Sequence, residues 1–236
     1  MFRKSLLLAS LVILALSANL SAQPELTIPE KSFDFGFVPQ NSQISHTFWL
    51  HSTGTDSLLI THVKPGCGCT KVPLDKTELG AKDSTALEVI FSTRTYRGKQ
   101  SKRPAITTNA GPNPQMVEFS ANVIDNPDET FPIKIAPYKF DISQFGETAR
   151  TKLEFTITNM SQEDLALNLI DINRKMFKLD LPSGVKAGQS VKGTIEIKDG
   201  FQETEFEKSL TIQLNDTSNS RFTIPIKRTI RNLAEK

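Results

Sequence analysis

Apolar and polar side chains alternate along most of the chain in short runs that end at turn residues. The clearest runs are "HTFWLHS", "STALEVIFS", "TKLEFTITN" and "KGTIEIKDG". A period of two places successive side chains on opposite faces of a strand, so each run predicts a strand with one buried face. The longer period of an α-helix is absent. Many short strands at even spacing are typical of a β-sandwich or a β-barrel.

The strand pattern occurs twice. The segment that begins at Phe33 aligns without a gap with the segment that begins at Phe140, at an offset of 107 residues. Further on, "AKDSTALEVIF" aligns with "AGQSVKGTIEI" at an offset near 106. Two copies of a β unit of about 105 residues explain this pattern most simply, and that length is typical of an immunoglobulin-like sandwich.

We therefore predict an all-β fold with two tandem immunoglobulin-like β-sandwich domains after an N-terminal signal peptide. The boundary falls in "VIDNPDETFPI", where Pro127 interrupts one strand and Pro132 limits pairing at the start of the next. The first domain is then residues 23–126 and the second is residues 127–236. Since the junction is short, we expect limited hinge freedom between them.

Residues 1–22 have the pattern of a secretory signal peptide. Arg3 and Lys4 precede an apolar run from Leu6 to Leu16, and small residues follow. The run is shorter than the roughly 20 apolar residues that a membrane span requires. We expect an exported protein, periplasmic or secreted, whose mature chain has no integral membrane segment.

Charge and motifs exclude several classes of function. The chain has 28 Lys and Arg against 26 Asp and Glu, and removal of Arg3 and Lys4 leaves 26 of each sign. A neutral chain has no general attraction for nucleic acid or an anionic membrane. The sequence also lacks the G-x-S-x-G, P-loop and H-E-x-x-H signatures. We therefore predict no enzyme activity, no catalytic residues, no cofactor and no nucleic-acid partner.

The first copy carries a specific combination of motifs. From Phe33 the chain contains "FDFG", a Phe-rich strand, "STG", "LLI", "GCGCT", a turn at Leu79-Gly80, and a hairpin that ends in "TTNA". This combination resembles, over Phe33 to Val123, a bacterial Ig-like family of exported proteins that is known only as a domain of unknown function. The family is similar to ASH/hydin-type and major-sperm-protein-type sandwiches, which are mostly binding modules. The resemblance implies a fold and export, without a known reaction.

The second copy departs from this motif, because "DINRKMFKLDLP" stands in place of the cysteine stretch. Whatever Cys67 and Cys69 do, the second copy does not do it.

Cys67 and Cys69 are the only cysteines, and one glycine separates them. In an extended strand their Cα atoms would lie about 6.6 to 7.2 Å apart, whereas disulfides have Cα atoms about 4.4 to 6.8 Å apart. A bridge therefore needs a bend, which Gly68 permits, and export favours oxidation. Closing so short a loop stabilises the fold by only about 1.6 kcal/mol. A structural disulfide, a redox-active or intermolecular thiol pair, a metal site and two unpaired thiols all remain open.

The metal alternative depends on histidine. His46, His51 and His62 are the only histidines, and Cys67 and Cys69 with His62 would offer ligands for zinc or cuprous copper. Strand alternation places His46 and His51 on opposite faces, so the three histidines do not converge. We interpret each histidine as a solvated or hydrogen-bonded surface side chain.

A basic cluster follows the run "STALEVIFS", in "RTYRGKQSKR". Its members are Arg94, Arg97, Lys99, Lys102 and Arg103. They would form a binding patch for an anionic glycan, a lipid headgroup or an acidic protein. Alternatively, they belong to a solvated hairpin whose charges keep a sheet edge from pairing with another strand. We favour this second interpretation.

The sequence thus favours a non-catalytic exported binding or interaction module, with another envelope or extracellular protein as its partner. A free sheet edge that accepts a partner strand is one physical route to such binding. The alternative is a thiol-redox or copper- or zinc-binding protein that acts through Cys67 and Cys69. No oligomeric state follows from the sequence.

Overall fold

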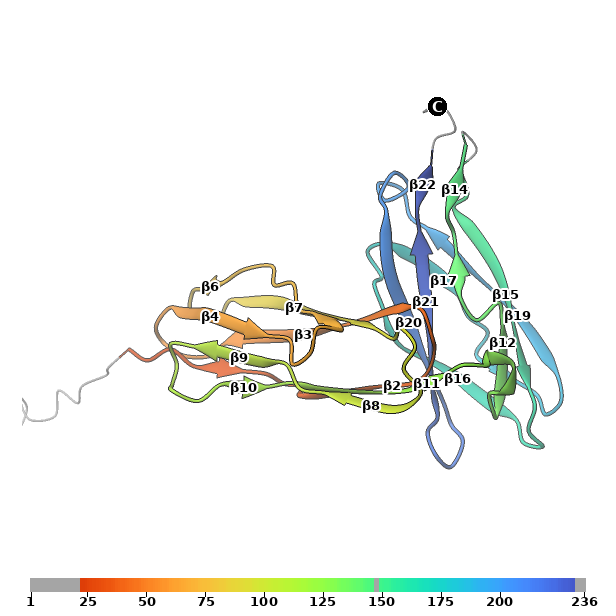
Figure 1. The fold of residues 1–236 in the computed structure, drawn as a ribbon, viewed down its shortest axis with the longest axis horizontal. Helices are drawn as coiled ribbons and strands as arrows, with labels where there is room; N and C mark the ends of the chain where they lie inside the picture. Colours follow the sequence, from red (N-terminus) through yellow and green to blue (C-terminus); the bar gives the residue numbers. More distant parts are fainter. Residues whose placement is uncertain (1–21, 147–148, 232–236) are drawn as a thin grey trace, which may run out of the picture.

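The structure is a computed structural model that describes residues 22–146 and 149–231. Strands form two sandwiches whose long axes point in different directions (Figure 1). The predicted all-β fold of tandem Ig-like sandwiches is confirmed. Residues 1–21 of the predicted signal peptide lie outside the described residues. Within the described ranges, no helix has the length and apolar character to span a bilayer.

The first sandwich contains eleven strands in two layers. One layer is the sheet β1-β3-β7-β5, and the other combines β10-β9-β4-β6 with β2-β11-β8. The bounds are β1 (Leu26–Thr27), β2 (Ser32–Pro39), β3 (Gln43–Ser52), β4 (Leu58–Lys64), β5 (Thr70–Lys71), β6 (Glu78–Leu79), β7 (Ser84–Ser92), β8 (Gly98–Lys102), β9 (Ala105–Thr108), β10 (Gln115–Met116) and β11 (Glu118–Ile124).

The second sandwich repeats this arrangement. The sheet β12-β15-β19-β17 faces β18-β16-β20-β21, and β13 pairs with β21 while β14 pairs with β22. The bounds are β12 (Ile133–Ala136), β13 (Phe140–Asp141), β14 (Gln144–Phe145), β15 (Lys152–Asn159), β16 (Leu165–Ile172), β17 (Phe177–Asp180), β18 (Gly184–Val185), β19 (Ser190–Ile197), β20 (Phe206–Leu214), β21 (Arg221–Arg228) and β22 (Ile230–Arg231). A 3₁₀ turn, Pro127–Glu129, lies between the sandwiches.

Each sandwich has its own apolar core. In β7 every second side chain is buried, as the alternation predicts. The first buried cluster draws on residues 26–123 and the second on residues 133–226, so they fall on either side of the predicted boundary. Phenylalanines are among the largest fully buried side chains of both clusters, and burial of each contributes about 1.5 to 3 kcal/mol. They include Phe35, Phe48, Phe91, Phe119, Phe140, Phe155 and Phe222.

The sequence repeat is also a repeat of strand pairing. Phe33 lies opposite Phe119 in β2 and β11, and Phe140 lies opposite Ile226 in β13 and β21. The pairs Leu26–Ser52 and Ile133–Asn159 show the same correspondence, as do Thr70–Phe91 and Phe177–Ile197. By this register, Cys67 to Cys69 correspond to Arg174 to Met176.

The two sandwiches share one sheet. β2 pairs with β11 of its own domain and, at Phe37 and Phe222, with β21 of the other. The result is a continuous order β18-β16-β20-β21-β2-β11-β8 across the junction. The ring of Phe37 stacks on that of Phe222 at 5.1 Å and packs against the second core.

Gly36 allows β2 to approach β21 this closely. Its φ is +64°, and a Cβ atom there would lie 2.1 Å from the carbonyl oxygen of Arg221. A residue with a Cβ atom is disfavoured at this φ, and at this position it could not be accommodated without displacement of the neighbouring strand.

Side chains of the second domain bond the β2 backbone on both sides of Gly36. The Thr223 hydroxyl donates to the Phe35 carbonyl at 2.6 Å, and the Tyr138 hydroxyl donates to the Phe37 carbonyl at 2.9 Å. Burial raises the pKa of Tyr138 far above its usual range, so this donor keeps its proton. The Lys139 ammonium donates to the Gln40 carbonyl at 2.7 Å. These contacts join β2 and the segment after it to the second domain.

Candidate functional site

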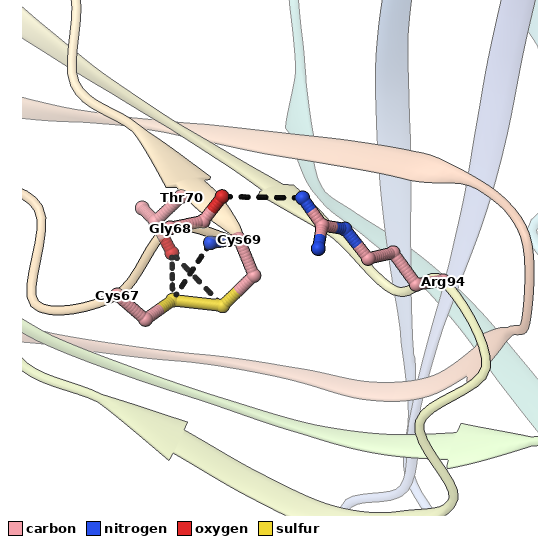
Figure 2. Close-up of a disulfide and its surroundings, with 5 residues drawn as sticks. All are labelled: Cys67, Gly68, Cys69, Thr70 and Arg94. Atoms are coloured by element: carbon pink, nitrogen blue, oxygen red, sulfur yellow. Dashed lines mark hydrogen bonds between the residues drawn. A yellow bond between two sulfur atoms is a disulfide. The ribbon is translucent and has the colours of Figure 1, made fainter.

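The structure joins Cys67 and Cys69 in a disulfide (Figure 2). The S–S distance is 1.95 Å and the two Cα atoms lie 5.3 Å apart. The segment is a turn between β4 and β5, in which Gly66 has a φ of +83°. The chain is therefore bent at the cysteines, which is the condition that a bridge between positions two apart requires.

Hydrogen-bonding groups surround one sulfur of this disulfide. The backbone N–H of Cys69 donates to Cys67 Sγ at 3.3 Å, and the Thr70 hydroxyl lies 3.2 Å from the same sulfur. The Arg94 guanidinium donates to the Gly68 carbonyl at 3.3 Å (Figure 2). Cys69 is buried in the first core, whereas Cys67 is only partly buried. The disulfide thus lies at the edge of the core, with Cys67 on the solvent side.

Replacement of both Cys67 and Cys69 by serine is expected to cost little stability. Because the closed loop is so short, the lost constraint on the unfolded chain amounts to about 1.6 kcal/mol. Urea unfolding followed by circular dichroism measures this change, and reduced wild-type protein is the matched control. A loss above about 3 kcal/mol would show that the disulfide organises more of the domain than its own turn.

The structure does not bring the three histidines to the cysteines. His62 is exposed on β4, opposite Thr107 of β9, and no contact joins it to either sulfur. In the part of the chain that the structure describes, no group of three or more His, Cys, Asp or Glu residues is placed to hold a metal ion. The two sulfurs are bonded to each other, so neither is a thiolate ligand here.

The interpretation of His46 as a surface side chain is wrong, because only 8% of the residue is exposed. Its ring stacks on Phe33 at 3.7 Å. Nδ1 lies 2.7 Å from an Asp171 oxygen of the second domain, and Nε2 lies 3.2 Å from a Glu30 oxygen. His46 lies on the same buried face of β3 as Phe48 and Leu50, and its bond to Asp171 makes it part of the interdomain contact as well.

The basic cluster is divided among local partners. Arg97 pairs with Asp125 at 3.0 Å, and Arg103 pairs with Glu118 at 3.0 Å. Hydrogen bonds from Ser101 and then from Arg103 lower the pKa of Glu118, although its slight desolvation acts in the opposite direction. Lys102 lies over the Tyr96 ring, 5.5 Å from its centroid, and Lys99 is exposed. This arrangement fits a charged hairpin better than a concentrated anion site.

A groove of about 620 Å³ lies in the corner between the two sandwiches. The outward faces of β3 and β7 form one wall, and the end of β16, the turn after it and β20 form the other. Trp49, the only tryptophan of the chain, lines this groove with 52% of its surface exposed. Because residues of both domains line it, the groove depends on how the two domains are docked.

Polar contacts between the domains fix the floor of the groove. The backbone N–H of Ser45 donates to the Ser209 hydroxyl at 2.9 Å, and this hydroxyl donates to the Ser45 carbonyl at 3.0 Å. Lys208 bonds both carboxylate oxygens of Glu88, at 2.6 and 2.7 Å. Because each contact joins one domain to the other, the two walls have a fixed separation.

Of the residues that line this groove, the sequence singles out only His46. The alternating run "HTFWLHS" contains Trp49, and Arg174 and Lys175 lie in the segment that replaces the cysteines. The repeat alignment does carry a signal, since Trp49 corresponds to Thr156 in the second copy. Only one of the two copies has a large aromatic residue at this outward strand position. The fold therefore does not need an aromatic residue there.

The fold and the groove define an immunoglobulin-like tandem sandwich with an interdomain recess. Residues 26–123 match the model of a family described as "Protein of unknown function (DUF1573)". This match confirms the resemblance seen in the motifs of the first domain. No curated protein sequence matches the chain.

Several solved structures have a similar fold. A protein of unknown function from Porphyromonas gingivalis W83 is 14% identical, with a TM-score of 0.34 over 86% of this chain and 98% of its own. The ASH/PapD-like domain 7 of human CEP192 is 12% identical, with a TM-score of 0.32 over 43% of this chain and 86% of its own. WR4, a C. elegans MSP family member, is 18% identical, with a TM-score of 0.31 over 42% of this chain and 97% of its own. These similarities concern the fold type alone.

Proposed function

We propose that this protein is a non-catalytic exported binding module, periplasmic or secreted, that recognises an envelope or extracellular component in the groove between its domains. The observation that carries the proposal is the groove itself, in which Trp49 is exposed on a wall whose position the interdomain contacts fix. Its volume of about 620 Å³ lies within the range of about 300 to 1,000 Å³ that is typical of ligand sites.

Rigidity supports the proposal in energetic terms. A ligand that enters a groove with fixed walls does not have to order the two domains, so less of its interaction energy is lost on binding. The shared sheet and the Glu88–Lys208 ion pair supply this preorganisation. A site composed from two domains also explains why the second sandwich, which lacks the cysteine motif, accompanies the first.

Site-specific photocrosslinking in intact cells tests this function. A benzophenone amino acid in place of Trp49 is expected to capture one reproducible envelope component. The same group in place of Leu59, which is exposed on the opposite sheet of the first domain, is the matched control and is expected to capture nothing specific. If both positions give the same background, the groove is not a recognition site and the proposal fails.

Thiol exchange at Cys67 and Cys69 is a second candidate function, favoured by the surroundings of Cys67 Sγ. The Cys69 N–H and the Thr70 hydroxyl would stabilise a thiolate on Cys67 after reduction. In that reaction a dithiol of a partner protein would give two electrons and two protons to the disulfide. The products are two cysteine thiols here and a disulfide in the partner.

Equilibration with glutathione redox buffers, followed by alkylation and mass measurement, tests the exchange role. A reduction potential above about −250 mV would support it, because structural disulfides of exported proteins have potentials below about −300 mV. A reduction potential below about −300 mV would assign Cys67 and Cys69 to a structural role.

A further inference from the structure

The two sulfurs of the disulfide differ in how easily a second molecule reaches them. Cys69 and the following Thr70 are each only 5% exposed, and Cys69 belongs to the first buried core. Cys67 packs against that core but remains partly exposed. Gly68 is exposed, and in the described part of the chain no atom outside the two cysteines lies within 4 Å of its would-be Cβ. A thiolate that approaches from solvent therefore meets the sulfur of Cys67.

Access decides which sulfur is attacked. Thiol–disulfide exchange begins when a thiolate attacks one sulfur and releases the other as a thiolate, and a more stable thiolate leaves faster. By this criterion alone, the donors around Cys67 Sγ would favour attack on Cys69. That preference is one of degree, whereas a sulfur enclosed by the core is closed to an external thiolate in the folded domain. The geometry thus favours attack on Cys67.

We infer that Cys67 forms the mixed disulfide with the dithiol of a partner protein, and that Cys69 is the sulfur released in that step. This inference rests on thiol exchange, the second candidate function above, and assigns the roles within it. A partner thiolate bonds Cys67 Sγ, the Cys67–Cys69 bond breaks, and its electron pair leaves on Cys69 Sγ, which takes up a proton. The partner's other thiolate then attacks the partner sulfur that is bonded to Cys67. Cys67 leaves as a thiolate and takes up the second proton.

The surroundings of the disulfide suit both steps. The Cys69 N–H donates to Cys67 Sγ at 3.3 Å, and the Thr70 hydroxyl lies 3.2 Å from Cys67 Sγ and 3.9 Å from Cys69 Sγ. This hydroxyl therefore reaches the thiolate that each step releases (Figure 2). Arg94 bonds the Gly68 carbonyl, and among the described residues none forms an ion pair with it. An unpaired cation beside the turn also stabilises a thiolate.

Glutathione attack on the wild-type protein tests the assignment directly. Reduced glutathione is added to the oxidised protein, the reaction is stopped at short intervals with N-ethylmaleimide at mildly acid pH, and tandem mass spectrometry locates the bound glutathione. At the earliest times we expect at least 10-fold more glutathione on Cys67 than on Cys69. Equal amounts on the two cysteines, or more on Cys69, would overturn the inference.

Two single-cysteine variants give an independent measurement. Cys69→Ser leaves the Cys67 thiol, and Cys67→Ser leaves the Cys69 thiol. Both variants are expected to fold, because so short a loop contributes little to stability. We expect Cys69→Ser to react with oxidised glutathione at least 10-fold faster than Cys67→Ser. In urea the two rates are expected to be equal, which is the control that the fold causes the difference. Equal rates in the folded variants would contradict the assignment.

The role of Thr70 as a positioning residue is tested by a pH profile. In the Cys69→Ser background, the rate of alkylation of Cys67 by iodoacetamide is measured against pH. Thr70→Val removes the hydroxyl and is expected to raise the midpoint of this profile by about one pH unit, because a donor to the thiolate is lost. Thr27→Val is the matched control, since Thr27 is exposed on β1 and bonds Thr53 instead. A midpoint that Thr70→Val leaves unchanged would contradict this role.

The outcomes separate this inference from the exchange function on which it rests. A reduction potential below about −300 mV would overturn thiol exchange and the inference together. A potential above about −250 mV with glutathione on Cys69 would support exchange and overturn only the assignment of roles. A potential above about −250 mV with glutathione on Cys67 would support both.

Discussion

Gly36→Ala is expected to lower the free energy of unfolding by about 3 kcal/mol or more, which is at the upper end for a single substitution. A residue with a Cβ atom pays about 1 to 2 kcal/mol for a φ of this sign. The new Cβ atom would also lie 2.1 Å from the carbonyl oxygen and 2.5 Å from the carbonyl carbon of Arg221. Both are backbone atoms, so β21 must move away from β2, and the stacking of Phe37 on Phe222 is weakened. Chemical unfolding followed by circular dichroism measures the loss.

Two other glycines separate the causes of this effect. Gly98 has a φ of +66° but no atom within 4 Å of its would-be Cβ, so Gly98→Ala is expected to cost about 1 kcal/mol. Gly68 has neither a positive φ nor a close neighbour, and Gly68→Ala is expected to change stability by less than about 0.5 kcal/mol. If Gly36→Ala lowered the free energy of unfolding no more than Gly98→Ala does, the result would contradict the close approach of β2 to β21.

Arg228→Met is expected to destabilise the second domain by about 3 kcal/mol. Arg228 is only 1% exposed, and its guanidinium joins three segments of the second sandwich. It donates to the carbonyls of Ile142 at 2.9 Å and Arg150 at 2.7 Å, to the Gln144 side-chain oxygen at 3.0 Å, and to the Gln202 carbonyl. Methionine fills much of the same volume but removes this donor, and for the buried oxygens of Ile142 and Gln144 the loss costs about 1 to 3 kcal/mol each.

Hydrogen exchange followed by mass spectrometry locates this effect. Faster exchange is expected in residues 133–226, with little change in the first core. Arg97→Met is the control, since Arg97 is exposed and its ion pair with Asp125 contributes about 0 to 1 kcal/mol. Equal effects of the two substitutions would contradict the role assigned to the buried guanidinium.

Local pattern was sufficient to predict the strands and their duplication. The alternation in β7 and β15 appears in the structure as alternate burial, and the 107-residue offset from Phe33 to Phe140 is the register of strand pairing. The bend at Gly68 also follows from elementary geometry, because two cysteines at this spacing cannot be bridged in an extended strand. These features depend on residues that are close in sequence or related by the repeat.

The groove could not be predicted in this way, because it depends on how the two domains dock. The alternation places His46 with the buried face of β3, but its partner Asp171 is 125 residues away in the sequence. Arg174 and Lys175 become functional candidates only once β16 is placed beside the first domain. The strand pairing of Phe37 with Phe222, which sets the docking angle, has no counterpart in the sequence repeat.

Residual dipolar couplings of the backbone N–H groups test the fixed docking of the two sandwiches most directly. Couplings measured in one weakly aligned sample are fitted separately for residues 26–123 and residues 133–226. Because β2 and β21 belong to one sheet, we predict the same alignment tensor, in magnitude and orientation, for both domains. Tensors of different magnitude would show that the domains reorient independently, which would contradict the fixed groove and the function proposed for it.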